Sequence, residues 1–317
     1  MKLEEIGFYT LSDKRAKNST INTILKRCEI ILTDACNFKC KYCRGLREDL
    51  KGTMSRRSVL NTLEVWTGDG LENVRFSGGE PTLLQDLPYY VRFCKDNGVR
   101  RIAVSTNGSA SRQVYSQLVD AGVNDFSISL DGGCCSVGDS MSGIAGSWHG
   151  VADNIRYLVE RTYVSVGAVF TENNVEHAVE LVTFAHNLGV ADIRVIPAAQ
   201  YNRALKNLAN LPKHILDAHP ILRYRVNNMK AGIPVRGIAP GSTDKCRLVL
   251  DDMAVAANKH FPCIIYLREG GDPIGKVDSN MRGERLRWME RHKPAKDPIC
   301  SKMCLDVCVA FNRTANG

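Results

Sequence analysis

Residues 28–43 read CEIILTDACNFKCKYC, and the rest of the chain is organised around this stretch. The apolar run at 28–33 predicts a short buried strand, and Cys36, Cys40 and Cys43 follow in the loop where that strand ends. Three thiolates at positions i, i+4 and i+7 can converge on one small inorganic centre and leave it one protein ligand short. Because metals react at open coordination positions, the stretch predicts a reactive metal centre.

Three more ordinary roles of cysteine fit this stretch less well. Half of a structural zinc site would more typically show a two-residue gap and then a second ligand pair. Ordinary buried thiols would not gather in a loop that is rich in Asn, Lys and Arg. A disulfide framework would leave one of the three cysteines unpaired.

The composition is that of a soluble globular protein. The chain has 317 residues, 44% of them hydrophobic and 24% charged, which allows one large domain and a small one. No apolar run is long enough to span a membrane, and the first residues lack the order of a secretion signal. We therefore expect a cytoplasmic protein with no membrane partner, in a compartment that keeps its twelve cysteines reduced.

From residue 28 onward, strand-like and helix-like segments alternate. Short apolar runs predict six strands, at 28–33, 73–77, 101–106, 125–130, 164–170 and 192–197. Segments of helical period lie between them, at 55–66, 86–97, 111–121, 151–161 and 175–188. Such strands imply a parallel sheet with right-handed crossovers. The pattern predicts an α/β fold, either an open doubly wound sheet or a partial barrel two units short of (β/α)8.

The alternation stops after Pro197. The sequence predicts a polar helix at 201–219, and turn signals such as Gly232 and Gly237 predict a linker at 220–245. The resulting division is an N-terminal extension at 1–26, a barrel at 27–200, a linker or helical segment at 201–242 and a small cysteine-rich domain at 243–317.

The C-x3-C-x2-C spacing, with Tyr42 before its last cysteine, resembles the cluster loop of the radical S-adenosylmethionine (SAM) enzymes. The resemblance implies that Cys36, Cys40 and Cys43 hold a [4Fe–4S] cluster whose fourth iron is chelated by the amine and carboxylate of SAM, and it places Tyr42 among the cofactor-binding residues. It favours the partial (βα)6 TIM-like barrel. It also implies that SAM is cleaved reductively to a 5′-deoxyadenosyl radical, which abstracts hydrogen from a substrate C–H.

A Gly-Gly-Glu-Pro segment follows the second predicted strand, after Ser77. Paired glycines at a strand end let the backbone approach a ligand closely, although an ordinary strand-to-helix turn would use the same residues. In the radical SAM family a segment of this kind binds the methionyl ammonium group. The resemblance therefore implies cofactor binding by Ser77, Gly78, Gly79 and Glu80.

Polar side chains follow the third and fourth predicted strands. Ser105 and Asn107 suit contacts with a ribose or a methionyl carboxylate. Alternation puts Ser127, Ser129 and Asp131 on one face of their strand, which we expect to face the barrel interior. The resemblance implies ribose binding by Ser129 and Asp131, whereas the alternative is a solvated cap of the next helix.

The last two strand ends carry weaker signals. In relatives, polar groups after the fifth strand contact SAM and the backbone of the sixth strand cradles adenine, which implies roles for Asn173 and Ile196. Capping of the next helix by Asn173 or Asn174 accounts for the asparagines equally well.

A second cysteine group lies in the C-terminal domain, at Cys246, Cys263, Cys300, Cys304 and Cys308. The segment 246–263 predicts two short strands about an Asp251–Asp252 turn, which would bring its end cysteines together. A zinc knuckle would account for such a group. The group also resembles the Twitch or truncated SPASM extension of radical SAM enzymes, which implies one auxiliary [4Fe–4S] cluster held by Cys246, Cys263 and two of the last three cysteines.

These features predict a radical SAM enzyme that receives electrons from a donor such as flavodoxin or ferredoxin. Its substrate would be a peptide, an amino-acid-like compound or another small molecule, and we expect no leader-peptide recognition domain before the barrel. Radical modification of a nucleotide or nucleobase is the alternative, although the formal charge of +8 and the basic segment at 282–296 do not by themselves indicate nucleic acid. A non-enzymatic iron–sulfur or zinc-binding protein is the third possibility.

Overall fold

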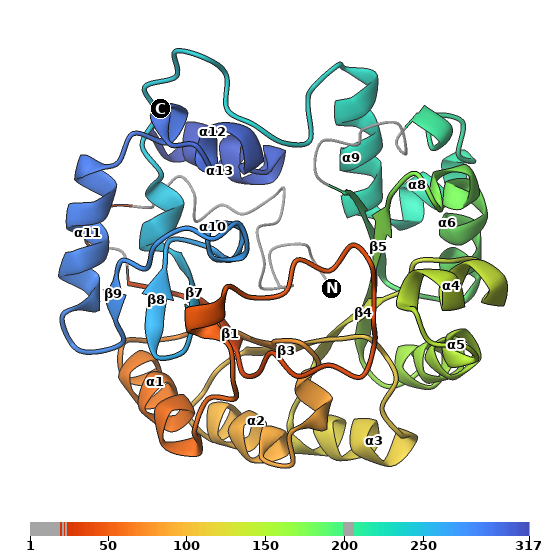
Figure 1. Cartoon of the computed structure of the whole chain (residues 1–317), viewed down its shortest axis with the longest axis horizontal. Coiled ribbons are helices and arrows are strands. Elements are labelled where there is room, and N and C mark those ends of the chain that lie inside the picture. The colour runs from red at the N-terminus through yellow and green to blue at the C-terminus, as the bar shows by residue number, and fades with distance from the viewer. Residues whose placement is uncertain (1–19, 21, 23, 199–205, 317) are drawn as a thin grey trace.

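The structure is a computed structural model that describes residues 20, 22, 24–198 and 206–316 (Figure 1). Most of the predicted N-terminal extension and the start of the helix predicted at 201–219 lie outside these residues. The description therefore begins at the first strand of the predicted barrel.

The six predicted strands form one parallel sheet. They are β1 (Arg27–Ile31), β2 (Asn73–Ser77), β3 (Arg101–Thr106), β4 (Asp125–Ser129), β5 (Tyr163–Phe170) and β6 (Asp192–Pro197). Their order along the sheet is their order along the chain, and each pairs in parallel with the next. The sheet curves without closing, so the predicted partial barrel is confirmed (Figure 1).

Helices cover the outer face of the sheet, as predicted. Five correspond to the predicted segments: α1 (Arg56–Gly68), α2 (Leu87–Asp96), α3 (Arg112–Ala121), α5 (Ser147–Val159) and α6 (Ala178–Asn187). The N-cap hydroxyls of Ser55 and Ser111 accept hydrogen bonds from backbone N–H groups of α1 and α3, which explains where these helices begin. An additional helix, α4 (Cys135–Ser142), was not predicted because Gly, Ser and Asp dilute its helical pattern.

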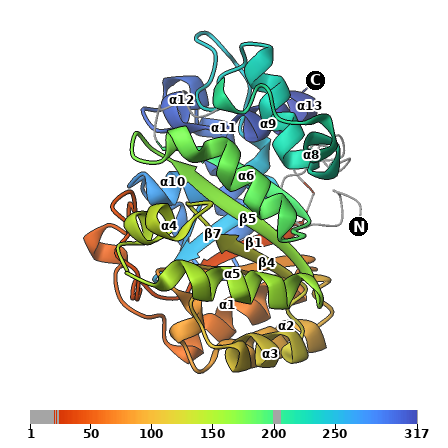
Figure 2. The ribbon, with the colours of Figure 1, turned by 90° about the vertical axis from the view of Figure 1, so that its right-hand side faces the viewer.

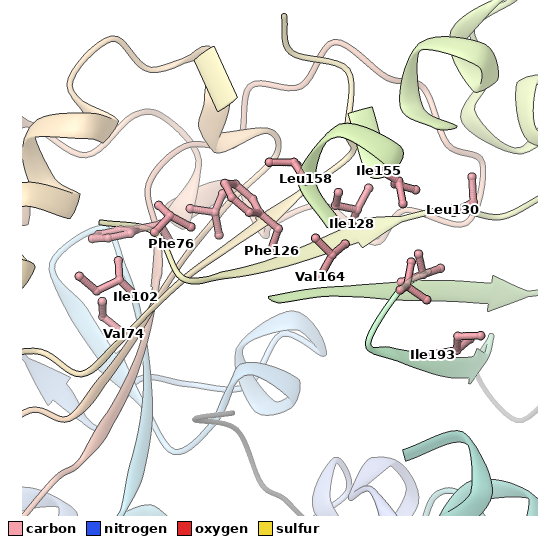
Figure 3. Close-up of a cluster of buried hydrophobic side chains, with 14 of the residues drawn as sticks. Val74, Phe76, Ile102, Phe126, Ile128, Leu130, Ile155, Leu158, Val164 and Ile193 are labelled. Carbon is pink, nitrogen blue, oxygen red and sulfur yellow. The ribbon is translucent and has the colours of Figure 1, made fainter. Parts of the chain in front are cut away.

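The alternation along each strand separates a hydrophobic core from a polar interior. Val74, Phe76 and Ile102 pack between the sheet and the helices together with Phe126 and Ile128 (Figure 3). The residues between them on the same strands point to the opposite, inner face. The core therefore lies outside the barrel, and the barrel interior is left for polar side chains.

The segment after β6 differs from its prediction. The structure has α8 (Lys213–Ala218) and then α9 (Pro220–Lys230), which packs against β6 where a linker was expected. Proline at the first helical position starts α9, because its missing N–H would have no partner there. The buried Asp192 carboxylate of β6 accepts hydrogen bonds from the backbone N–H groups of Ile221 and Leu222, which fixes the start of α9 on the barrel.

The C-terminal region adds strands and short helices to the barrel. Its elements are β7 (Asp252–Ala256), β8 (Lys259–Phe261), α10 (Ile264–Arg268), β9 (Gly275–Lys276), α11 (Met281–Arg291), α12 (Cys300–Met303) and α13 (Asp306–Asn316). β7 pairs in parallel with β1, and β8 and β9 follow it antiparallel. Helices α11–α13 lie at the end of the molecule opposite α1–α3 (Figure 2).

The predicted hairpin between Cys246 and Cys263 exists, but its turn is not where the sequence placed it. The chain reverses at Ala257–Asn258, whose φ values are 48° and 60°. Asp251 and Asp252 are instead fully enclosed, and the Asp251 carboxylate lies 3.3 Å from Nε of the buried Arg27 in β1. The Asp-Asp pair therefore serves the contact between the barrel and the C-terminal region.

Candidate active site

The carboxyl ends of the strands open into a cavity of about 510 Å³. Its walls come from all six barrel strands, from the cysteine loop after β1 and from the C-terminal region. Cavities of this size at this end of a parallel α/β barrel are the usual place for small-molecule chemistry.

Cys36, Cys40 and Cys43 all line this cavity, as predicted for a shared centre. Cys36 and Cys43 are exposed and Cys40 is half-buried. Burial raises the pKa of Cys40 to about 11, and the charges of Asp131, Cys43 and Cys36 contribute to the rise. A bound metal centre would reverse this effect, because it stabilises the thiolate.

The spacing of these sulfur atoms fits a cluster better than a single ion. A tetrahedral zinc ion with Zn–S bonds of about 2.3 Å holds its sulfurs about 3.8 Å apart. Within the described residues, no three cysteine sulfurs lie within 4.8 Å of one another. As they stand, the three thiols of the loop are therefore spaced too widely to share a single tetrahedral ion, a spacing that a larger centre such as a [4Fe–4S] cluster does not require.

The Gly-Gly turn packs directly against the cysteine loop. A Cβ on Gly78 would lie 2.5 Å from the carbonyl oxygen of Thr33, and one on Gly79 would lie 2.5 Å from that of Asp34. The N–H of Gly79 donates to Thr33 at 2.6 Å, and the N–H of Glu80 donates to Ala35 at 2.8 Å. Glycine is thus required for the loop to sit on the turn, and both Gly78 and Gly79 also face the cavity together with Ser77.

Glu80 does not line the cavity. Its carboxylate is fully enclosed and accepts hydrogen bonds from the N–H and hydroxyl of Thr82, the hydroxyl of Thr106 and the N–H of Asn107, the last at 2.6 Å. Burial raises the pKa of Glu80. In this structure the side chain joins the ends of β2 and β3, so the predicted contact with SAM remains a prediction.

Tyr42 and Asp131 form one unit in the cavity wall. The Tyr42 hydroxyl donates to the Asp131 carboxylate, and the N–H of Val169 donates to the same carboxylate at 2.7 Å. The side-chain amide of Asn174 donates to the backbone carbonyl of Asp131 at 3.0 Å and so stabilises the same segment. These hydrogen bonds connect the cysteine loop to the ends of β4 and β5. Asn174 stabilises this connection, and its side chain makes no capping hydrogen bond at the start of the helical turn that follows it.

Asn107 lies beside the first cysteine. Its amide nitrogen is 3.8 Å from Sγ of Cys36 and donates to the Asn37 side chain at 2.8 Å. Ser105, Asn107, Ser129 and Ile196 all line the cavity, as the sequence predicted. Asn173 is exposed and does not line it.

The cavity also holds charged residues that the sequence pattern did not single out. Arg75, Arg194 and Arg225 line it, and Tyr163 lies among them. Arg75 donates to the Ser105 hydroxyl at 2.9 Å, and Arg194 donates to the Ser127 hydroxyl. A signal for two of them was present, since Arg75 and Arg194 occupy inward positions of their strands.

Part of this arginine group lacks a protein partner. Among the described residues, Nε of Arg194 and the hydroxyl of Tyr163 are buried and make no hydrogen bond. Burial, and secondarily the neighbouring Arg75, lower the pKa of Arg194. Both carboxylate oxygens of Asp125, which also lines the cavity, are buried as well, without a hydrogen bond to any described residue. Because buried polar groups are costly without partners, this part of the cavity is suited to a polar ligand that carries acceptors for Arg194 and Tyr163 and a donor for Asp125.

The five C-terminal cysteines form a second group on the far side of the cavity. Cys263 and Cys308 line the cavity itself, whereas Cys246, Cys300 and Cys304 lie behind its wall. Burial is the largest cause of the raised pKa of Cys263, and charges on Cys246 and Cys304 raise it further. The predicted convergence of the hairpin ends with the later cysteines is therefore present in the structure.

Comparison with protein families identifies the barrel. Residues 30–185 match the family model of the radical SAM superfamily. A probable GTP 3′,8-cyclase from Metallosphaera sedula is 29% identical over 176 residues, which are 54% of this chain and 55% of that protein. A second one, from Saccharolobus solfataricus, is 30% identical over 175 residues, 54% of this chain and 56% of the relative. The match thus spans about half the length of these curated relatives.

Solved structures share the fold at low sequence identity. SuiB from Streptococcus suis, solved with its precursor peptide SuiA, superposes with a TM-score of 0.62 at 16% identity and covers 94% of this chain and 78% of its own. The enzyme anSMEcpe, solved with AdoMet and a peptide, superposes with a TM-score of 0.59 at 14% identity and covers 91% of this chain and 95% of its own. These likenesses extend beyond the barrel into the C-terminal region.

Among the described residues, no helix is long and apolar enough to cross a bilayer. The partial barrel, the cavity at its strand ends and the family match over 30–185 agree with one another. The cofactors characteristic of this family, a [4Fe–4S] cluster and SAM, fit the cysteine loop described above. Residues 30–185 of the chain form a radical SAM domain.

Proposed function

We propose that this chain is a radical SAM enzyme that acts on a small anionic substrate held inside its barrel. The observation that carries the first part is that Cys36, Cys40 and Cys43 share one cavity with the Gly78–Gly79 turn. When bound there, the cluster and SAM supply a 5′-deoxyadenosyl radical that can abstract a hydrogen atom. The protein holds SAM against the cluster, orients the substrate and excludes water.

The residues that would hold SAM surround the cysteine loop. The backbone of Gly78 and Gly79 faces the cavity without a Cβ, which suits the methionyl ammonium group. Asn107 is next to Cys36, and Ser129 is exposed to the cavity on the adjacent strand. Asp131 is held by Tyr42, so we assign it to the site mainly as the anchor of the cysteine loop.

The arginine group supports an anionic substrate. Arg194 presents a buried Nε without a partner, and Tyr163 presents a buried hydroxyl without one. Phosphate or carboxylate oxygens would satisfy both donors, and guanidinium groups bind such oxygens with strong, charge-assisted hydrogen bonds. A nucleotide is one substrate of this class, and the names of the archaeal relatives also point to a nucleotide.

A peptide substrate is the second candidate. SuiB was solved with its precursor peptide and anSMEcpe with a peptide, and both share this fold. The fold alone does not transfer a substrate, and the buried donors around Arg194 favour a compact anion over a neutral side chain. A binding protein without catalytic activity would explain the cysteines but not the polar strand ends that line the cavity.

Four of the five C-terminal cysteines, Cys246, Cys263 and two of the last three, would hold one auxiliary [4Fe–4S] cluster beside the substrate. Cys263 and Cys308 face the cavity, so a cluster on this group would lie at its edge. All twelve cysteines lie within the described residues and are free thiols, which fits a reducing, cytoplasmic setting. An electron donor such as flavodoxin or ferredoxin would supply the reducing electron.

Anaerobic reconstitution tests the first part of the proposal. The protein, incubated with dithionite and SAM, should form 5′-deoxyadenosine, and Cys40→Ala should abolish this product while Cys135→Ala, which changes an exposed thiol outside both groups, should not. A Cys40→Ala variant that formed 5′-deoxyadenosine at the wild-type rate would refute the assignment.

A substrate panel tests the second part. Nucleoside triphosphates, small carboxylates and short peptides would be compared in their ability to accelerate SAM cleavage. Arg194→Lys keeps the charge but loses the planar donor set, so it should raise the KM of the active compound about tenfold or more with a smaller change in uncoupled SAM cleavage. If only neutral peptides accelerated cleavage, the anionic substrate would be wrong.

A further inference from the structure

A cluster of three different metal-binding side chains lies outside the cavity. Among the described residues, His292, Asp297 and Cys300 form the only set of three such groups whose ligand atoms all lie within 4.8 Å of one another. Nε2 of His292 is 3.6 Å from Sγ of Cys300 and 3.9 Å from Oδ2 of Asp297. All three side chains are half-buried, and none of them lines the cavity of the candidate active site.

These distances are close to those around a tetrahedral metal ion. With Zn–N and Zn–O bonds of about 2.1 Å and a Zn–S bond of about 2.3 Å, neighbouring nitrogen and sulfur ligands lie about 3.6 Å apart, and nitrogen and oxygen ligands lie about 3.4 Å apart. The separation between His292 and Cys300 already matches, and the one between His292 and Asp297 needs a shift of about 0.5 Å at the carboxylate. The nitrogen, oxygen and sulfur donors together form a ligand set that zinc accepts.

Each of the three side chains is held in place by its surroundings. The His292 ring stacks on Trp288 with ring centroids 3.9 Å apart. Oδ1 of Asp297 accepts the backbone N–H groups of Ile299 and Cys300 at 2.9 and 2.7 Å, and Oδ2, which lies 3.9 Å from Nε2 of His292, accepts the Tyr266 hydroxyl at 3.2 Å. Such outer contacts are what orients ligands in metal sites.

The site has an entry path and a structural task. His292 also lines a separate cavity of about 440 Å³ along α11, so an ion can reach it without passing through the barrel. α12 has only four residues and buries none of them, so little in the helix itself fixes it. An ion bound by these residues would join the end of α11 to the start of α12.

We propose that His292, Asp297 and Cys300 bind one divalent transition-metal ion, with zinc as the expected metal and water as the fourth ligand. This goes beyond the proposed function, because the site is separate from the barrel cavity. It also divides the five C-terminal cysteines: Cys300 serves this ion, and the auxiliary cluster is left to Cys246, Cys263, Cys304 and Cys308.

Metal analysis of the anaerobically reconstituted holoprotein tests the proposal. We expect about one zinc and, for two [4Fe–4S] clusters, about eight iron atoms per chain. His292→Ala and Cys300→Ser should each lower the zinc at least about tenfold and leave the iron unchanged. His292→Cys, which restores a zinc ligand, should recover the zinc, and exposed His149→Ala should change neither metal.

Cobalt provides a second readout that does not require activity. Titration of the zinc-free holoprotein with Co²⁺ should give a thiolate-to-cobalt absorption band that Cys300→Ser removes. The proposal is overturned if the wild type holds no metal besides iron and forms no such band, or if Cys300→Ser loses about half of its iron, because Cys300 would then be a cluster ligand. Either result leaves 5′-deoxyadenosine formation at the first centre as a separate measurement, so the proposed function would not fail with it.

Discussion

Replacement of Glu80 by Gln separates two roles of the Gly-Gly-Glu-Pro segment. In the structure the carboxylate receives backbone N–H groups on both of its oxygens, from Thr82 on one and from Asn107 on the other. In either orientation, the NH2 group of a glutamine would face one of these donors. Hydrogen bonds to a charged group contribute about 1.5–3 kcal/mol each, and an opposed pair of donors adds a desolvation cost. We therefore expect Glu80→Gln to lower the free energy of unfolding by about 2–4 kcal/mol.

Urea unfolding of the metal-free protein, followed by far-UV circular dichroism, measures this loss. Glu172→Gln is the matched control, because Glu172 is exposed just after β5 and should unfold like the wild type. SAM affinity, measured by equilibrium dialysis on the reconstituted protein, gives the second readout. If Glu80→Gln unfolded at the wild-type midpoint but bound SAM at least about tenfold more weakly, Glu80 would be a direct ligand contact and the structural role argued here would be wrong.

Three further variants test separate parts of the structure. Gly79→Ala should displace the cysteine loop and remove the iron of the first centre. The control Gly150→Ala, at a position on α5 with no neighbouring atoms, should keep its iron and be stabilised by about 0.5–1 kcal/mol. Equal iron content in the two variants would contradict the packing of the Gly79 turn on the loop. Asp251→Ala leaves the enclosed Arg27 without its carboxylate and should lower the free energy of unfolding by about 3–5 kcal/mol in urea; a loss below about 1 kcal/mol would count against it. Burial raises the pKa of Asp192 from 3.8 to about 6, so the folded state binds the carboxyl proton more tightly than the unfolded state does. The protein should therefore lose up to about 3 kcal/mol of stability as the pH rises from about 4 to about 6, and Asp192→Asn should lack this loss. Identical pH profiles of the two proteins in urea unfolding would contradict this prediction.

The local pattern of the sequence was sufficient for the order of the strands and helices, whereas the choice of a partial barrel over an open sheet came from the resemblance of the cysteine loop. Strands such as β2 alternate Val74 and Phe76, which face the helices, with Arg75 and Ser77, which face the cavity, and this period is visible without a structure. Two of the helices between the strands, α1 and α3, begin at capping serines, which places their first residues. The site residues at strand ends followed, because parallel strands bring their carboxyl ends to one edge.

Features that depend on distant partners were predicted less well. The turn assigned to Asp251–Asp252 lies at Ala257–Asn258, because the buried contact with Arg27 joins residues far apart in the sequence and leaves no local signal. Four donors from the ends of β2 and β3 surround the Glu80 carboxylate, which no local pattern indicated, and its expected contact with SAM stays a prediction. Arg194 could have been found, since a charge at an inward strand position is rarely left without a function.

The C-terminal region contacts the cysteine loop directly, through residues of α10 and of the segment just after it. The guanidinium of Arg268, at the end of α10, donates to the carbonyl of Gly45 after the cysteine loop and to that of Gly78 in the Gly-Gly turn, both at 3.0 Å. Arg44 pairs with Glu269 across the same contact. β7 also pairs with β1, the strand that leads into the cysteine loop. Because the loop is thus held both by the turn beneath it and by α10, variants of the C-terminal cysteines should keep these arginine contacts, so that any change at the first centre can be assigned to the lost thiol.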